Sequence, residues 1–134
     1  MTVDEAKKEL RLIKDLEKDI KSVELEIERL MTIATKMTPS YDIVKSCSKD
    51  KIAEALIRVE DYRARLSNLI NESIDHKERC LKKVRKIEPR SLSTVLFYYY
   101  FMDFTMEKTA EKIGKSYQWT YTMYTEALEK YSKV

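Results

Sequence analysis

The sequence predicts an all-α protein, in which a long N-terminal antiparallel helical hairpin precedes a C-terminal module of shorter helices. One glycine and two prolines among 134 residues are too few for a fold of many short strands, which needs turn residues. Apolar residues recur three and four positions apart through most of the chain, the spacing of one helix face. We expect the hairpin to span residues 1–87 and the C-terminal module residues 88–134.

The first helix carries a narrow apolar seam between charged positions. The seam repeats every 3.5 residues on average, as in coiled coils, and such a helix needs a partner. The partner is either the second helix of the same hairpin or a second copy of the chain, which would form a homodimer. The residues of this first-helix seam are Ile13, Leu16, Ile20, Val23, Ile27, Leu30 and Ala34.

A polar stretch over residues 35–50, containing Pro39, interrupts this pattern and predicts a loop. A second helix starts near Asp50 and folds back antiparallel to the first. It ends at Glu88-Pro89, because proline pushes the residue before it out of the helical region. One side of this helix carries Ala55, Val59, Tyr62, Leu66, Leu69, Leu81, Val84 and Ile87.

The C-terminal module begins with a predicted helix over Arg90–Met102, whose aromatic run Phe97–Phe101 is apolar on every side and should be buried between neighbours. Thr105 is the expected N-cap of a helix that ends at Ile113. Gly114, the one glycine of the chain, follows directly, as a left-handed C-cap does.

Ser116 then caps a last helix, from Tyr117 to about Tyr131. Tyr124, Ala127 and Leu128 are spaced to face inward. A short helix, a tight glycine turn and a longer helix together predict a helix-turn-helix.

Charge and aromatic residues are unevenly distributed. Residues 1–76 carry 14 Lys and Arg against 16 Asp and Glu, whereas residues 77–134 carry 12 against 7. Residues 77–86 alone hold six basic side chains. This run either contacts the DNA backbone, contacts an acidic partner, or forms the solvated face of a helix. Eleven of the 13 aromatic residues follow residue 96. An anionic partner is therefore expected on the C-terminal half.

Several function classes are not supported by the residues. A chain with one histidine, no glycine-rich phosphate loop and no Ser or Cys beside a base lacks the parts of an enzyme. His76 and Cys80 are four positions apart, but a structural zinc site takes four ligands, so we expect no metal and no cofactor. No apolar stretch approaches the ~20 residues of a membrane span, and the first residues lack a secretory signal. We therefore expect reduced cysteines, no membrane contact and a cytoplasmic location.

The C-terminal residues resemble the fourth region of bacterial sigma factors. The matching positions are Thr109-Ala110, Ile113-Gly114, Ser116, Thr120 and Ala127-Leu128. With the charged hairpin in front, the whole chain resembles small regulators of phages and prophages of Gram-positive bacteria, of the ArpU and RinA type. The resemblance implies a phage-encoded transcriptional regulator that binds double-stranded promoter DNA through a sigma-region-4-like helix-turn-helix, with RNA polymerase as a further partner.

The resemblance places the DNA contacts around the glycine turn. Gln118 is the best candidate for reading a base, because its amide can both donate to and accept from adenine. The expected base-contacting residues are Tyr117, Gln118, Trp119, Tyr121 and Thr122. The expected phosphate-contacting residues are Arg90, Lys108, Lys112, Lys115 and Ser116.

A second interpretation is a protein-binding adaptor with a degenerate helix-turn-helix. The segment Tyr117–Glu129 contains no Lys or Arg, although phosphate neutralisation supplies much of the affinity for DNA. Exposed aromatic rings are common at protein–protein hot spots, so this helix would contact RNA polymerase, another host protein or a second copy. Thr109, Lys115 and Thr120 are polar where the sigma pattern is usually apolar, which predicts weaker packing between the two helices.

Overall fold

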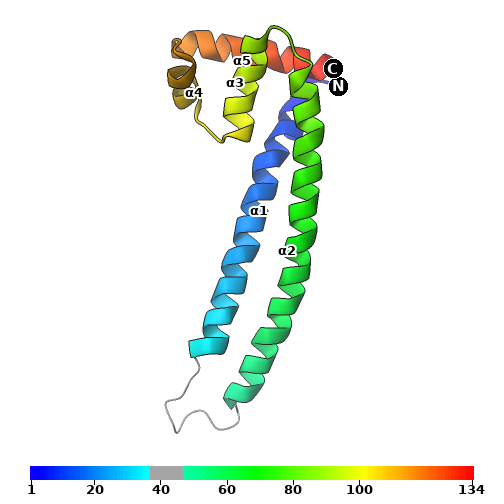
Figure 1. The fold of residues 1–134 in the computed structure, drawn as a ribbon, viewed down its shortest axis with the longest axis vertical. Helices are drawn as coiled ribbons and strands as arrows, with labels where there is room; N and C mark the ends of the chain where they lie inside the picture. Colours follow the sequence, from blue (N-terminus) through cyan, green and yellow to red (C-terminus); the bar gives the residue numbers. More distant parts are fainter. Residues whose placement is uncertain (37–46) are drawn as a thin grey trace. The chain divides into compact units, whose positions relative to one another are not determined.

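The structure, a computed structural model, describes residues 1–36 and 47–134. These residues contain helices and no strand, which confirms the all-α prediction (Figure 1). The predicted loop over residues 35–50 lies mostly outside the described residues, although α1 ends and α2 begins within it. The elements are α1 (Val3–Lys36), α2 (Cys47–Arg85), α3 (Arg90–Leu96), the π-helical segment η1 (Phe97–Phe101), α4 (Met106–Ile113) and α5 (Tyr117–Lys133).

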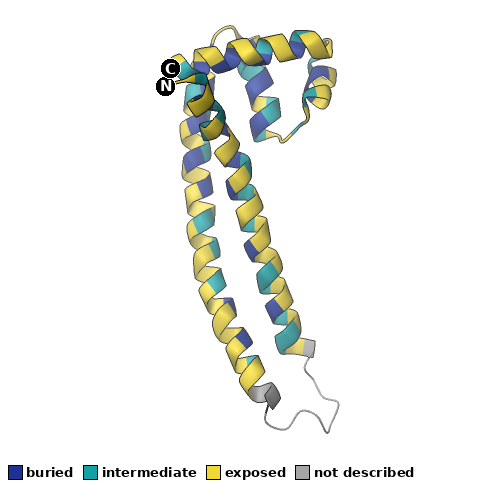
Figure 2. Ribbon diagram, turned by 180° about the vertical axis from the view of Figure 1, so that it is seen from behind, coloured by how far each residue is buried: buried dark blue, intermediate teal, exposed yellow. Residues whose placement is uncertain are grey.

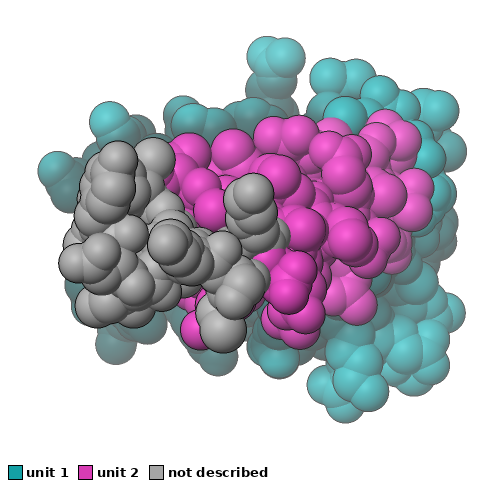
Figure 3. All heavy atoms as spheres, turned by 90° about the horizontal axis from the view of Figure 1, so that it is seen from below, with its two compact units in different colours: residues 1–16, 73–134 teal, residues 17–72 magenta. Residues whose placement is uncertain are grey.

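The chain forms two compact units that divide it differently from the boundary predicted after residue 87 (Figure 3). Unit 1 contains Met1–Leu16 and Ser73–Val134, and unit 2 contains Glu17–Glu72. The start of α1 and the end of α2 therefore belong with the C-terminal helices. The reason is a shared core, because Leu10 of α1 and Val84 of α2 lie in one buried cluster with residues of α3 and α5.

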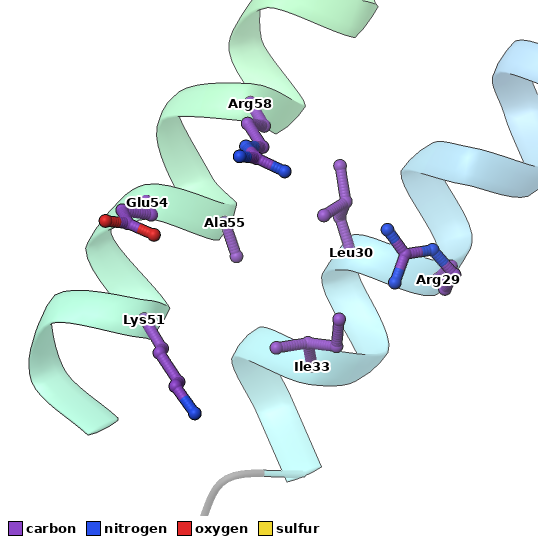
Figure 4. A pocket seen from close by; sticks show the side chains of 7 residues that line it. All are labelled: Arg29, Leu30, Ile33, Lys51, Glu54, Ala55 and Arg58. Atoms are coloured by element: carbon purple, nitrogen blue, oxygen red, sulfur yellow. The ribbon is translucent and has the colours of Figure 1, made fainter. Parts of the chain in front are cut away.

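Unit 2 is an antiparallel pair of helices, in which the first-helix seam faces α2. Leu30, Ala55 and Val59 are buried together, and Ile27 and Tyr62 pack against them. Figure 4 shows Leu30 and Ala55 turned toward each other between the helices, with charged side chains around a shallow hollow of about 200 Å³.

In the structure, the partner of the first-helix seam is the second helix of the same hairpin. Leu16, Val23 and Leu30 are buried within the single chain. A homodimer along this seam would have to open the hairpin, so the structure does not support that mode of self-association.

Unit 1 has the larger core, formed by α3 and α5 with the adjoining ends of α1 and α2. α5 buries a stripe of residues three and four positions apart, and the stripes are visible as dark segments in Figure 2. Tyr124, Ala127 and Leu128 are buried, which confirms the prediction that they face inward. The buried members of this core are Ala6, Leu10, Ile13, Cys80, Val84, Ile87, Leu92, Val95, Leu96, Tyr100, Tyr124, Ala127, Leu128 and Tyr131.

The capping residues around the turn adopt the predicted geometry. The Thr105 hydroxyl accepts a hydrogen bond from the Lys108 amide at 3.1 Å, and the Ser116 hydroxyl accepts one from the Trp119 amide at 3.1 Å. Gly114 has φ of 77°, and its amide donates to the Ala110 carbonyl at 2.9 Å. No atom lies within 4 Å of the place where a Cβ would stand at Gly114, so glycine is required there by its backbone angle and not by crowding.

Ser116→Ala should lower the free energy of unfolding by about 1 kcal/mol, because the Trp119 amide loses its capping acceptor. Thr125→Ala is the matched control on the same helix, since the exposed Thr125 hydroxyl only donates to the preceding-turn carbonyl of Tyr121. Urea unfolding followed by circular dichroism measures both variants. Equal stability of the two would show that the Ser116 cap does not hold the start of α5.

The two threonines at usually apolar positions of the sigma pattern are fully buried. Thr109 donates its hydroxyl hydrogen to the Thr105 carbonyl at 2.9 Å, and Thr120 donates to the Ser116 carbonyl at 2.8 Å. Each hydroxyl is thus satisfied within its own helix. The polar residues therefore occupy interior positions without leaving an unpaired group.

The predicted helix over Arg90–Met102 is present, because α3 and η1 follow each other without a break from Arg90 to Phe101, but the prediction that its whole aromatic run is buried is wrong. The run is π-helical, closed by the Met102 amide donating to the Phe97 carbonyl at 3.1 Å. Within the run only Tyr100 is buried, and Phe97 is 38% exposed. Five consecutive bulky rings point in all directions around a helix, so one neighbour cannot cover them all.

Candidate nucleic-acid interface

The capped turn presents four of the predicted base-contacting residues on one face of α5. Tyr117, Gln118, Tyr121 and Thr122 are all exposed, and positions four apart lie one above the other on a helix. Tyr117 and Tyr121 are 50% and 52% exposed, and their rings stack with centroids 6.4 Å apart and an interplanar angle of 13°. These residues occupy the first turns of α5, the part of a recognition helix that contacts base edges.

Trp119 differs from these four residues in its burial. It lies on the far side of α5 from Tyr117 and beside Thr122, because a helix turns by about 100° per residue. Its ring is partly buried, and the Lys115 Nζ lies 5.5 Å from the ring centroid. Trp119 is therefore better placed to hold Lys115 beside the turn than to reach a base.

Three of the predicted phosphate-contacting lysines lie on α4 and in the turn that follows it. Lys108 and Lys112 are exposed and four positions apart, so they share one side of α4, and exposed Lys115 follows Gly114 in the turn. The Lys108 Nζ lies 4.8 Å from the Phe104 ring centroid. The Ser116 hydroxyl is used by the Trp119 amide, so any phosphate contact there would come from the backbone N–H groups that open α5.

Arg90 does not join this group. It begins α3 and lines a hollow together with Lys130, which lies near the far end of α5. From Tyr117 to Lys130, α5 rises about 20 Å. Arg90 therefore lies on a different part of unit 1 from Lys112 and Lys115, and a phosphate contact there stays a prediction.

The charge along α5 changes sign with position. The neutral first turns lie beside Lys112 and Lys115, whereas the exposed residues Glu126 and Glu129 follow further along the helix. Lys130 and Lys133 come next in the last turn, so the acidic and basic residues of the second half of α5 balance. Attraction of a polyanion to this region therefore depends on the lysines of α4 and the turn.

A cluster of tyrosines supports this face from beneath. The Tyr100 and Tyr124 hydroxyls lie 2.7 Å apart in the core, and the Tyr124 ring centroid is 6.0 Å from that of exposed Tyr121. Burial raises the pKa of both Tyr100 and Tyr124, so both remain neutral phenols. A continuous set of rings therefore joins the exposed tyrosines to the core of unit 1.

A second polar cluster, elsewhere in unit 1, was not predicted from the sequence. Glu9 Oε1 accepts hydrogen bonds from Lys83 Nζ and from the Tyr131 hydroxyl, each at 2.8 Å. His76 Nε2 lies 2.7 Å from the Glu9 carbonyl oxygen and 3.5 Å from Cys80 Sγ. Partial burial acts to raise the pKa of Glu9. The hydrogen bonds from Lys83 and Tyr131 outweigh this effect, so the pKa lies below its ordinary value.

The hydrogen bonds of this cluster join α1, α2 and α5. Burial raises the pKa of the Cys80 thiol, which keeps it protonated. Among the described residues, no three His, Cys, Asp or Glu side chains gather as a metal site would require. The Cys47 side chain lies outside the described set.

Comparisons with models of protein families, with curated proteins and with solved structures gave no match. In the part of the chain that the structure describes, no helix is both long enough and apolar enough to span a bilayer.

Proposed function

We propose that this chain is a phage-encoded transcriptional regulator that binds double-stranded promoter DNA through α4, the Gly114 turn and α5, in the host cytoplasm. One observation carries the proposal. The left-handed turn at Gly114 and the Ser116 cap together present an exposed face of α5 next to three exposed lysines. This is the arrangement that a sigma-region-4-like helix-turn-helix needs.

In this proposal the first turns of α5 enter the major groove. The Gln118 amide pairs with the N6 and N7 of an adenine, and the Thr122 methyl contacts a thymine methyl. The Thr122 hydroxyl already donates to the Gln118 carbonyl at 2.9 Å, which leaves its methyl group for apolar contact. Tyr117 and Tyr121 contribute a stacked pair of rings with hydroxyl groups at the edge of the same face.

Lys108, Lys112 and Lys115, on α4 and in the turn, neutralise phosphates. With three phosphate contacts, the logarithm of the association constant should fall against the logarithm of the salt concentration with a slope of about −2.7. Binding of this kind is weak at physiological salt and is best measured at low salt.

The test is fluorescence anisotropy with labelled DNA fragments from the promoters next to the chain's own gene. Lys112→Glu combined with Lys115→Glu should weaken binding by about tenfold or more on every fragment and reduce the salt slope by about 2. Gln118→Ala should reduce the preference among fragments by about 1–3 kcal/mol at one base position and leave the slope unchanged.

Lys133→Glu is the matched control, because Lys133 is exposed at the far end of α5. It should bind as the parent chain does. No binding at low salt, or an equal loss with Lys133→Glu, would rule out DNA recognition by this face.

The alternative function, an adaptor that binds RNA polymerase or another host protein, is favoured by a different observation. Tyr117 and Tyr121 form an exposed stacked pair on a helix segment without basic residues. If the adaptor function is correct, purified RNA polymerase should be retained by the lysine variant and lost with Tyr117→Ala combined with Tyr121→Ala. If DNA binding is correct, the lysine variant should lose promoter fragments.

A further inference from the structure

A groove in unit 1, formed by the end of α2, by α3 and by η1, has the chemistry of a docking site. We propose that it binds an acidic segment of another protein, in which carboxylates flank an apolar side chain. The groove has a volume of about 310 Å³. Its principal lining residues are Leu81, Val84, Arg85, Arg90, Phe97 and Tyr98. This surface is distinct from the exposed face of α5, and the inference does not rest on the proposed DNA binding.

The inner part of the groove is apolar. Val84 is almost fully buried at its base, Leu81 is partly buried, and Phe97 is 38% exposed on its wall. The volume lies at the lower end of the range of small-ligand pockets, enough for one or two apolar side chains. The ring and the aliphatic side chains together offer an apolar contact for one side chain of a partner.

The rim of the groove is positively charged. Arg85 and Arg90 are both exposed, and both also line an adjoining hollow of about 690 Å³ together with Lys130. Within the described parts of the chain, neither guanidinium has a carboxylate at ion-pair distance. A guanidinium presents paired N–H donors that match a carboxylate, so two such groups beside an apolar pocket suit an acidic segment.

The same features disfavour a nucleic-acid strand. Glu88 lines the adjoining hollow together with the basic residues, so its carboxylate interrupts the positive charge there. The Phe97 ring stacks on Phe101 with centroids 5.6 Å apart, which occupies one ring face. A strand with a charge at every phosphate needs a continuous basic track and open rings, whereas a peptide can space its carboxylates around one apolar residue.

The test is fluorescence anisotropy with a labelled peptide in which Glu and Asp alternate with Leu and Phe. Arg85→Glu combined with Arg90→Glu should weaken peptide binding by about tenfold or more, because both carboxylate contacts become repulsive. Phe97→Ser should weaken peptide binding by several fold, because the apolar side chain of the peptide loses its contact with the ring. The same peptide with Gln and Asn in place of its acidic residues should bind the parent chain as weakly as the acidic peptide binds the arginine variant.

Arg63→Glu combined with Arg65→Glu is the matched control, because it makes the same charge change at exposed positions of unit 2. It should bind the peptide within about twofold of the parent chain, and circular dichroism should show equal helix content in all variants. Equal losses of binding in the two double variants would show that binding depends only on the net charge of the chain, which would overturn the proposal.

Two further outcomes would assign the groove to another occupant and also overturn the proposal. The first is tighter binding of a labelled thymidine oligonucleotide than of the peptide, with loss in the arginine variant. The second is self-association of the parent chain in sedimentation velocity that the arginine variant abolishes.

Discussion

Leu10→Ala should lower the free energy of unfolding of unit 1 by about 2–5 kcal/mol, the cost of emptying a fully buried leucine site. Leu10 is on α1, far along the chain from the C-terminal helices, yet it shares their core. The variant should therefore shift the unfolding transition of the C-terminal helices. Urea unfolding followed by the fluorescence of Trp119, the single tryptophan, measures this shift.

Leu12→Ala is the matched control, because Leu12 lies on the same helix and is 39% exposed. It should change the stability by about 0.5 kcal/mol or less. If Leu10→Ala leaves the Trp119 transition where it is in the parent chain, the C-terminal helices fold without α1. The boundary after residue 87 would then be the better description of the chain.

Glu9→Ala should destabilise unit 1 by about 1–3 kcal/mol at neutral pH, because the buried Tyr131 hydroxyl and the Lys83 ammonium lose their common acceptor. Tyr131 is fully buried and cannot turn to water for a replacement. Thermal or urea unfolding followed by circular dichroism measures the loss. Glu5→Ala is the control, an exposed acidic residue on the same helix.

The same carboxylate should make stability depend on pH in the acid range. Its pKa in the folded chain lies below the ordinary value of 4.5, so folding favours the ionised form. The stabilisation is therefore complete above that ordinary pKa and is lost as the pH falls through the lowered folded value. Glu9→Gln should consequently differ most from the parent chain near neutral pH and least in acid. An unchanged difference at every pH would show that the Glu9 charge does not stabilise the fold.

Local features of the fold could be predicted from the sequence because they depend on neighbouring residues. Thr105, Gly114 and Ser116 cap or turn the chain through groups within a few positions, and each residue type has its own preference for that role. The inward side of α5 followed from the spacing of Tyr124 and Leu128. The exposed Tyr117 and Tyr121 lie along the edge of this same side, in the first turns of the helix, where the Tyr121 ring contacts Tyr124.

The division into units could not be predicted in the same way. The heptad pattern of the first helix continues through residue 16 without a change, although the partners of the seam change from one unit to the other. Periodicity shows which side of a helix is buried but not what buries it. The Glu9 and Tyr131 contact is also invisible in the sequence, because it joins residues 122 positions apart.

The groove residues illustrate a further limit. Arg90 was grouped with the lysines of the turn because all are basic and lie in the same half of the chain. The path of the chain from α2 into α3 decides whether Arg90 lies near the Gly114 turn or near Arg85. The charge composition carries no information about that path. Only the lining of the groove brings Arg85, Arg90 and Phe97 together.

The π-helical segment η1 has a consequence for how this chain is aligned with other helical proteins. A π-helical turn holds about one residue more than an α-helical turn, as if a single residue had been inserted. Because η1 continues α3 and the helix ends after Phe101, the shift in helical phase affects the positions of η1 alone. An α-helical relative without the extra residue would reach the same end of the helix one residue earlier, so an alignment without a gap would pair residues from different sides of the helix over this segment.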